Sequence, residues 1–198
     1  MDTQKPALIA LVLAGGKSSR MGKDKALIPW QGIPILERVC QTAESCCQQV
    51  YILTPWPERY QPLLREDYQY LEESNPGLGP LVALAQGLTQ ITSDRSVDWV
   101  LLLACDLPQL ETEILQTWIN QLSQVPSETL ALVPRQREGW EPLCGFYRPA
   151  VSTSLQNFIN QGGRSFQTWL SDLPAQSLSV GEQAAEMLWN CNTPEDLS

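Results

Sequence analysis

Two apolar runs constrain the fold of this chain more than any other feature of its sequence. Residues 8–13 read LIALVL and residues 99–105 read WVLLLAC, with no charged or amide side chain in either run. A strand with one solvent-facing side alternates apolar and polar residues, whereas a strand covered on both faces is apolar throughout. Both runs are therefore predicted to be strands of a parallel sheet that carries helices on both faces.

Shorter segments with strand and helix patterns alternate along the rest of the chain. This alternation predicts a Rossmann-like, three-layer α/β/α sandwich around a mostly parallel sheet. A chain of 198 residues is long enough for one buried core, so residues 1–198 are expected to form a single domain. Further strands are predicted at 50–53, 68–71, 130–133 and 143–147, helices at 33–46, 81–90, 111–122, 151–160 and 165–170, and a charged turn at 135–141.

The absence of histidine excludes several classes of active site. No catalytic triad and no imidazole-ligated metal centre can be built from this sequence. The six cysteines contain no C-x-x-C pair, and without an export signal they are expected to be free thiols. The remaining chemistry belongs to carboxylates, lysine, arginine, backbone amides and a hard cation.

Charge is distributed unevenly along the chain. The net charge of -9 argues against nucleic-acid binding and against membrane-surface binding. No apolar run approaches the ~20 residues that span a bilayer, and the first six residues lack the apolar segment of a signal peptide. A cytoplasmic location is therefore expected. Basic charge is concentrated in one short segment, which contains Lys17, Arg20, Lys23 and Lys25.

That basic segment directly follows the first predicted strand and begins with two glycines, Gly15 and Gly16. Glycines at a strand end let backbone amides approach an anionic ligand. The spacing fits neither the Walker A loop nor the G-x-G-x-x-G fingerprint. Instead, Arg20 can hold phosphate oxygens bidentately and Lys25 can act as a point charge. The segment is interpreted as a triphosphate-binding loop, with a purely structural turn as the alternative.

Asp106 follows the second apolar run and precedes Leu107-Pro108. A carboxylate at this position needs a partner, exposure to solvent or a bound cation. The alternative interpretation is an N-cap for the next helix, since aspartate caps helices well. Ligands of open α/β sheets bind outside the carboxyl ends of the strands, and Asp106 and the glycine loop both occupy such positions.

The segment Leu-Ala-Gly-Gly-x-Ser-x-Arg-Met-Gly-x-Asp-Lys-Ala-Leu, residues 13–27, resembles the opening motif of the molybdenum cofactor guanylyltransferases. The resemblance extends to residue 197, and Asp-Leu-Pro at 106–108 also matches the family. It implies transfer of GMP from GTP to molybdenum-bound molybdopterin, with Mg²⁺ on Asp106. It further implies catalytic roles for Arg20, Lys25 and Asp106, and nucleotide binding by Leu13, Ala14, Gly15, Gly16, Lys25, Glu73 and Asp106.

The same resemblance implies an acceptor site formed by Arg164, Asn190 and Asn192. The two asparagines have the spacing of residues that share one strand face. Thr193-Pro194 can instead be interpreted as the cap and first position of a last helix. Two positions depart from the family pattern. Leu53-Thr54 stands where an Asn is usual, and Glu72-Glu73 stands where an Asp is expected, with Glu73 keeping the carboxylate.

Two other functions remain open from the sequence. One is a sister nucleotidyltransferase: a cytidylyltransferase on the same pterin, or an enzyme that uses a sugar or lactyl phosphate. The other is an inactive binding module that delivers cofactor. Beyond the substrates GTP and molybdenum-molybdopterin, molybdenum-insertion proteins and cofactor-receiving apoenzymes are the expected partners.

Overall fold

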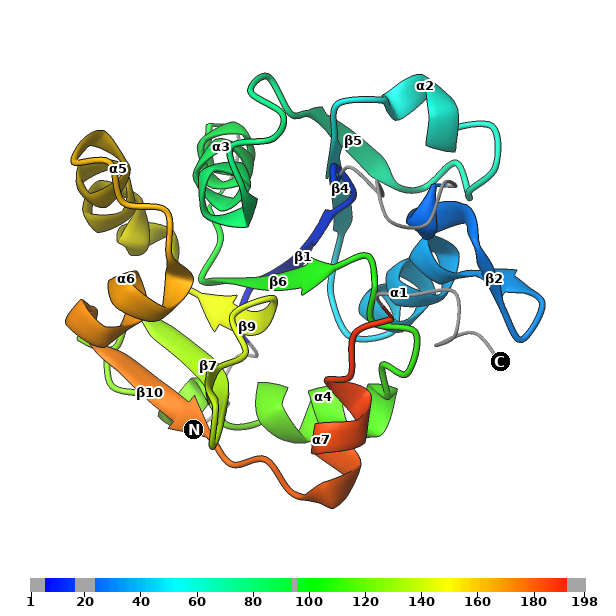
Figure 1. The fold of residues 1–198 in the computed structure, drawn as a ribbon. Coiled ribbons are helices and arrows are strands. Elements are labelled where there is room, and N and C mark those ends of the chain that lie inside the picture. The colour runs from blue at the N-terminus through cyan, green and yellow to red at the C-terminus, as the bar shows by residue number, and fades with distance from the viewer. Residues whose placement is uncertain (1–5, 17–23, 94–95, 192–198) are drawn as a thin grey trace.

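The computed structural model describes residues 6–16, 24–93 and 96–191. Helices cover both faces of a central sheet (Figure 1), which confirms the predicted three-layer α/β/α architecture. The strands are β1 (Leu8–Leu13), β2 (Pro29–Trp30), β3 (Ile33–Pro34), β4 (Val50–Thr54), β5 (Gln69–Glu72), β6 (Trp99–Ala104), β7 (Ala131–Gln136), β8 (Gly139–Trp140), β9 (Cys144–Tyr147) and β10 (Ala175–Leu178). The α-helices are α1 (Ile35–Glu44), α2 (Pro57–Tyr60), α3 (Pro80–Thr92), α4 (Thr112–Ile119), α5 (Ser152–Asn160), α6 (Phe166–Asp172) and α7 (Glu182–Met187). The 3₁₀ turns are η1 (Lys25–Leu27), η2 (Leu122–Gln124) and η3 (Pro149–Val151).

The main sheet has the strand order β10-β7-β9-β6-β1-β4-β5. Strands β5, β4, β1 and β6 pair in parallel, and β9 is antiparallel to both of its neighbours. From β1 the chain moves outward to β4 and β5 and then crosses back to β6, on the other side of β1. The switch point therefore lies between β1 and β6, where Leu13 is the register partner of Ala104. Ligands of doubly wound sheets bind at this point.

The central strand β1 is buried on both faces, as its sequence predicts. Ile9 and Leu11 belong to a core cluster that includes residues of α3, α5 and α6. Ala10 and Val12 belong to a second cluster, on the opposite face, that includes residues of α1, α4 and α7. Among the described residues, no helix is both long and apolar enough to cross a membrane.

A small hairpin, β2–β3, precedes α1 and was not predicted. Its two turn residues, Gln31 and Gly32, have φ values of 51° and 84°. Two consecutive positive φ angles are typical of the tight turn that joins antiparallel strands. The prediction that a helix begins at residue 33 is therefore wrong: residues 33 and 34 pair with β2, and α1 begins at Ile35.

The charged segment 135–141 was predicted to be a turn, and only residues 137 and 138 form one. Arg135 and Gln136 extend β7 and pair with Trp140 and Gly139 of β8, so most of the segment forms a hairpin. Three further elements, α2, β10 and α7, were missed because each is short and carries little apolar periodicity. The edge strand β10 forms by pairing in parallel with β7.

Candidate active site

A cavity of about 430 Å³ lies at the switch point, beside the carboxyl ends of β1 and β6. It has the size and position expected of a small-ligand site in an open α/β sheet. Five residues that the sequence assigned to the nucleotide line it, from three separate segments of the chain. The lining includes Leu13, Gly15, Gly16, Glu73, Gly77, Gly79, Pro80, Ala83, Ala104, Cys105, Asp106 and Leu143.

Gly15 permits a close approach between the loop after β1 and the carboxylate of Glu73. A Cβ atom at residue 15 would overlap Glu73 Oε2 and would lie 3.2 Å from the ring of Pro55. Glu73 is only 7% exposed, and its backbone N–H donates to the carbonyl of Thr54 at the end of β4. Burial raises the pKa of the Glu73 carboxyl group. The cavity therefore contains a carboxylate that the protein holds at some energetic cost.

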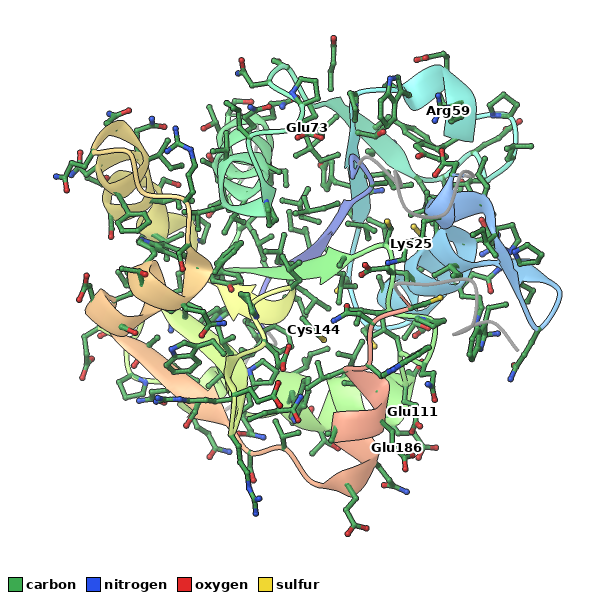
Figure 2. The ribbon with its side chains drawn as sticks, viewed as in Figure 1. Lys25, Arg59, Glu73, Glu111, Cys144 and Glu186 are labelled. Carbon is green, nitrogen blue, oxygen red and sulfur yellow. The ribbon has the colours of Figure 1, made fainter. Side chains whose placement is uncertain are left out.

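Lys25 and Asp106 form an ion pair beside this cavity, with 2.8 Å between Lys25 Nζ and Asp106 Oδ2. Lys25 (labelled in Figure 2) lies on η1, the 3₁₀ turn that Asp24 caps by accepting a hydrogen bond from the N–H of Ala26. Asp106 follows β6 by two residues. The fold thus joins Lys25 to the strand-tip carboxylate, although the two residues are far apart in the sequence.

The second carboxylate oxygen of Asp106, Oδ1, is buried and has no hydrogen-bond partner in the described part of the chain. A buried oxygen without a partner is costly, so it marks a position where a donor or a cation fits. The described residues contain no cluster of three or more His, Cys, Asp or Glu side chains that would hold a metal without help. One carboxylate suits Mg²⁺, which binds through one or two carboxylates plus substrate phosphates.

Cys105, which was predicted only to end an apolar strand, lies against the same site. Burial raises the pKa of its thiol to about 12, and the neighbouring Asp106 carboxylate adds to this effect. The thiol therefore stays protonated and is not a nucleophile.

The C-terminal segment reaches the same strand tip. The backbone N–H of Cys191 donates to the carbonyl of Asp106 at 3.1 Å, which brings the neighbouring Asn190 close to the ion pair. The ring centroids of Trp189 and Trp30 lie 6.0 Å apart, so the β2–β3 hairpin packs against this segment. Asn190 belongs to no strand, so the prediction that it shares a strand face with Asn192 is wrong at this residue. Asn192 and Arg20 lie outside the described residues.

Arg164 lies apart from the cavity, in the exposed turn between α5 and α6. Its Nη1 donates to the carbonyl of Ile159 at 3.0 Å and to that of Gly163 at 2.6 Å. In this arrangement the guanidinium caps the end of α5, and the residue is not part of the cavity lining.

The wall of the cavity that precedes α3 was not predicted from the sequence. Gly77 and Gly79 have φ values of 87° and 91°, which L-side chains rarely adopt. The Gly-x-Gly-Pro pattern before an amphipathic helix was the available signal. Leu143 was predicted only to pack in a strand and also lines the cavity. Leu53 and Thr54, where the family pattern is broken, are buried and do not contribute to the lining.

Comparisons of the sequence with known proteins agree on one family. The family profile described as "MobA-like NTP transferase domain" matches residues 10–176. A protein of Trichormus variabilis named "Probable molybdenum cofactor guanylyltransferase" is 54% identical over 191 residues, which cover 96% of this chain and 89% of that protein. A protein of Synechococcus elongatus with the same name is 46% identical, with 94% of each chain covered.

A solved structure supports the fold. The molybdopterin-guanine dinucleotide biosynthesis protein A of Archaeoglobus fulgidus superposes with a TM-score of 0.76 and 21% identity. The superposition covers 95% of this chain and 94% of the other. At this level of identity the match supports the α/β architecture rather than the details of the site.

Proposed function

The chain belongs to the MobA-like nucleotidyltransferase family, and on that premise we propose that it transfers the guanylyl group of GTP to molybdenum-bound molybdopterin. The products are the guanine dinucleotide form of the cofactor and pyrophosphate. Relatives with up to 54% identity bear the name of this activity, and they match nearly the whole chain. The enzyme class follows from the family, and the choice of guanine follows from these relatives.

One observation carries the reaction type. Asp106 presents a carboxylate at the switch point with one oxygen on Lys25 and the other buried without a partner among the described residues. A paired cation and carboxylate at the end of a nucleotide-sized cavity suit phosphoryl chemistry, in which the protein mainly positions groups and stabilises charge. A binding module without catalytic activity would not require this arrangement.

The proposed step is an in-line displacement at the α-phosphorus of GTP. The terminal phosphate of molybdopterin forms the new P–O bond, the bond to the β-phosphate oxygen breaks, and pyrophosphate leaves with the electron pair. A phosphate nucleophile is already anionic near neutral pH, so no general base is needed, which agrees with the absence of histidine. Lys25 stabilises negative charge on the triphosphate, and Arg20 is proposed to act on the leaving group.

MobA-type nucleotidyltransferases generally use a divalent metal, and we assign Mg²⁺ to Asp106. When bound there, the ion would supply positive charge to the triphosphate oxygens. Glu73 is proposed to accept hydrogen bonds from the nucleoside, because an ionised carboxylate only accepts and both ribose and guanine offer donors. Leu13, Ala14, Gly15 and Gly16 would supply backbone contacts to the nucleotide.

On the acceptor side, Asn190, Asn192 and Arg164 remain the proposed contacts to the pterin. The hydrogen bond between Cys191 and Asp106 supports this proposal for Asn190, because it brings that residue near Asp106, where the reacting phosphates would bind. We further propose that residues 1–198 act as one nucleotidyltransferase domain in the cytoplasm. Its proposed partners are molybdenum-insertion proteins and cofactor-receiving apoenzymes.

Pyrophosphate release tests the proposed activity. The protein is incubated with Mg²⁺, molybdate, molybdopterin and, in separate reactions, GTP, CTP, ATP or UTP. We expect release with GTP that depends on molybdopterin. Release with CTP instead would support the cytidylyltransferase. Without release from any triphosphate, the binding module and an enzyme that uses a sugar or lactyl phosphate remain, and adding those phosphates as acceptors separates the two.

A further inference from the structure

We propose that Arg59 and Tyr60 are positioning residues for Lys25 and that they act through the carboxylate of Asp24. The inference rests on the proposed function, because Lys25 matters there as the cation that faces the triphosphate. Arg59 and Tyr60 both belong to α2. Neither of them lines the cavity, and the family motif assigns no role to either.

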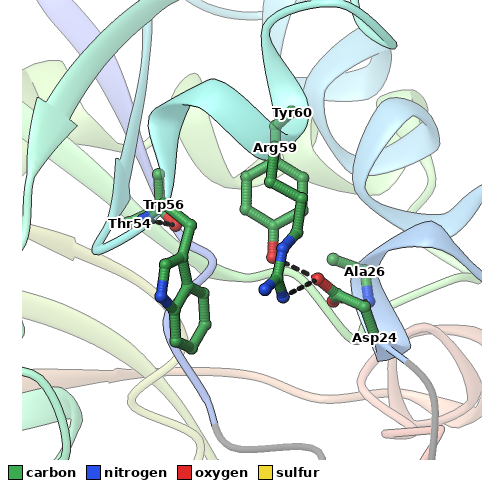
Figure 3. A network of polar contacts seen from close by, with 6 residues as sticks. All are labelled: Asp24, Ala26, Thr54, Trp56, Arg59 and Tyr60. Carbon is green, nitrogen blue, oxygen red and sulfur yellow. Dashed lines mark hydrogen bonds and ion pairs between the residues drawn. The ribbon is translucent and has the colours of Figure 1, made fainter.

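The contacts converge on one carboxylate (Figure 3). Asp24 Oδ2 accepts a hydrogen bond from Arg59 Nη1 at 2.9 Å and another from the hydroxyl of Tyr60 at 2.9 Å. Asp24 Oδ1 accepts from the backbone N–H of Ala26 at 3.2 Å and so caps η1. Lys25 is the first residue of η1. Helix α2 thus fixes the turn that carries the lysine.

Tyr60 is the buried part of this network. Its side chain is 1% exposed, and burial, together with the hydrogen bond to Asp24, raises the pKa of the phenol. The hydroxyl therefore keeps its proton at any physiological pH and donates to the carboxylate. A buried, charge-assisted hydrogen bond of this kind is stronger than one between neutral groups.

Arg59 is more exposed, at 46% of its side chain, and an exposed ion pair alone contributes little. Its guanidinium also lies 4.6 Å from the ring centroid of Trp56. The backbone N–H of Trp56 donates to Thr54 Oγ1 at 3.2 Å, at the end of β4. Arg59 is therefore restrained from two sides, and the network runs from the tip of β4 to η1.

The network also has an electrostatic consequence. Asp24 directly precedes Lys25, so its carboxylate is a natural competitor for the ammonium group. Both Asp24 oxygens are engaged by groups other than Lys25, whereas Lys25 Nζ lies 2.8 Å from Asp106. We infer that α2 withdraws the Asp24 charge from Lys25 and keeps the ammonium group directed toward the strand tip where the triphosphate would bind.

A double-mutant cycle separates positioning from a general structural role. We expect Tyr60→Phe and Arg59→Ala each to lower kcat for pyrophosphate release about 10-fold, with a smaller change in KM for GTP. In a Lys25→Ala background neither substitution should lower kcat further, and Arg59→Lys should restore part of the activity. Arg65→Ala is the matched control, because Arg65 forms a similarly exposed pair with Glu44 at 2.7 Å. Two results would overturn the proposal. One is a loss of kcat that adds to the loss caused by Lys25→Ala, and the other is a loss of kcat that is fully explained by a lower melting temperature.

A second measurement does not depend on activity. In protein labelled with ¹³C-lysine, the Cε signal of Lys25 is assigned with a Lys25→Arg variant. We expect this signal to shift in Tyr60→Phe and Arg59→Ala and to stay in place in Arg65→Ala. An unmoved Lys25 signal in both α2 variants would contradict the inference even if the enzyme is active. If the Lys25 signal shifts but the wild-type protein releases no pyrophosphate, the inference about Lys25 stands and the proposed function is rejected.

Discussion

The ammonium nitrogen of Lys25 lies 2.8 Å from the Oδ2 atom of Asp106, across a sequence separation of 81 residues. The pairing of β1 with β6 contributes to this contact, because it brings the carboxyl ends of the two strands side by side, and Asp106 follows one of these ends. The side chains of Lys25 and Asp106 are 14% and 23% exposed, so the pair is shielded yet open to a ligand. Such a pair can exchange its internal contact for contacts to a triphosphate and its metal ion.

The first prediction concerns this pair. Asp106→Asn keeps the shape of the side chain and removes its charge, so kcat should fall by about 10²-fold or more, as for the loss of a main electrostatic stabiliser. The circular dichroism spectrum should not change, because a carboxylate at a strand tip contributes little to the core. Near-normal turnover by Asp106→Asn would leave the residue a structural role only, such as its carbonyl bond to Cys191.

The second prediction compares the two glycines of the loop after β1. In Gly15→Ala the new methyl group would displace the Glu73 carboxylate, whose flexible end can move away. We therefore expect a modest loss of stability, about 1 kcal/mol, together with a clear loss of GTP affinity in calorimetry. Gly16→Ala is the control, because among the described residues a Cβ at residue 16 has no neighbour within 4 Å. Its melting temperature should equal that of the wild type. Equal GTP affinity of Gly15→Ala and the wild type would mean that Glu73 has no role in binding.

The third prediction follows from the pKa of Glu73, which burial raises. An acid with a raised pKa in the folded state binds more protons folded than unfolded. Stability therefore falls as the pH rises from the ordinary carboxyl pKa of about 4.3 to the raised value, and it stays lower above that. Glu73→Gln should thus melt at a higher temperature than the wild type at pH 7, and the difference should vanish near pH 4.

The same substitution should weaken GTP binding by about 10-fold or more, since it removes a charged acceptor. If the variant is more stable but binds GTP less tightly, then Glu73 is a binding residue whose presence lowers the stability of the fold. If Glu73→Gln lowers the melting temperature at pH 7, then the carboxylate has a partner that stabilises it, and its assignment to the nucleotide is weakened.

The fourth prediction separates the two described acceptor candidates. Asn190→Asp introduces a negative charge next to the segment that is bonded to Asp106, where it would repel the pterin phosphate. Product formation should fall by a larger factor than GTP affinity. Arg164→Ala removes the bonds to the carbonyls of Ile159 and Gly163, so in the absence of an acceptor role it should lower only the melting temperature. A selective loss of product formation in Arg164→Ala would establish its acceptor role.

The architecture could be predicted from the sequence because the two clearest apolar runs form the central strands of the sheet, β1 and β6. Residues 8–13 and 99–105 have no polar side, and burial on both faces is the one arrangement that accommodates such strands in water. The alternating order of the elements then fixed which strand ends meet. That is why the cavity collects Gly15 and Asp106, as expected from their places after two strands, whereas Glu73 was assigned to the nucleotide only by the family resemblance.

What the sequence did not reveal depends on pairing and on side-chain geometry. The edge strand β10 reads AQSL and has no pattern of its own, so it forms through its ladder with β7. The turn at Gln31 and Gly32 has positive φ at both residues. Glutamine is uncommon at such a position, so the sequence does not predict the turn. The convergence of Arg59 and Tyr60 on Asp24 is a tertiary contact that no local signal marks.

The mass of the pterin product tests the central claim most directly. Purified protein is incubated with molybdopterin, molybdate, Mg²⁺ and an equimolar mixture of GTP and CTP, and the released pterin is analysed by mass spectrometry. We predict a product whose mass exceeds that of the pterin by one guanylyl group, formed by the wild type and lost in Asp106→Asn. A cytidylyl adduct, or an unmodified pterin from the wild-type protein, would contradict guanylyl transfer by this chain.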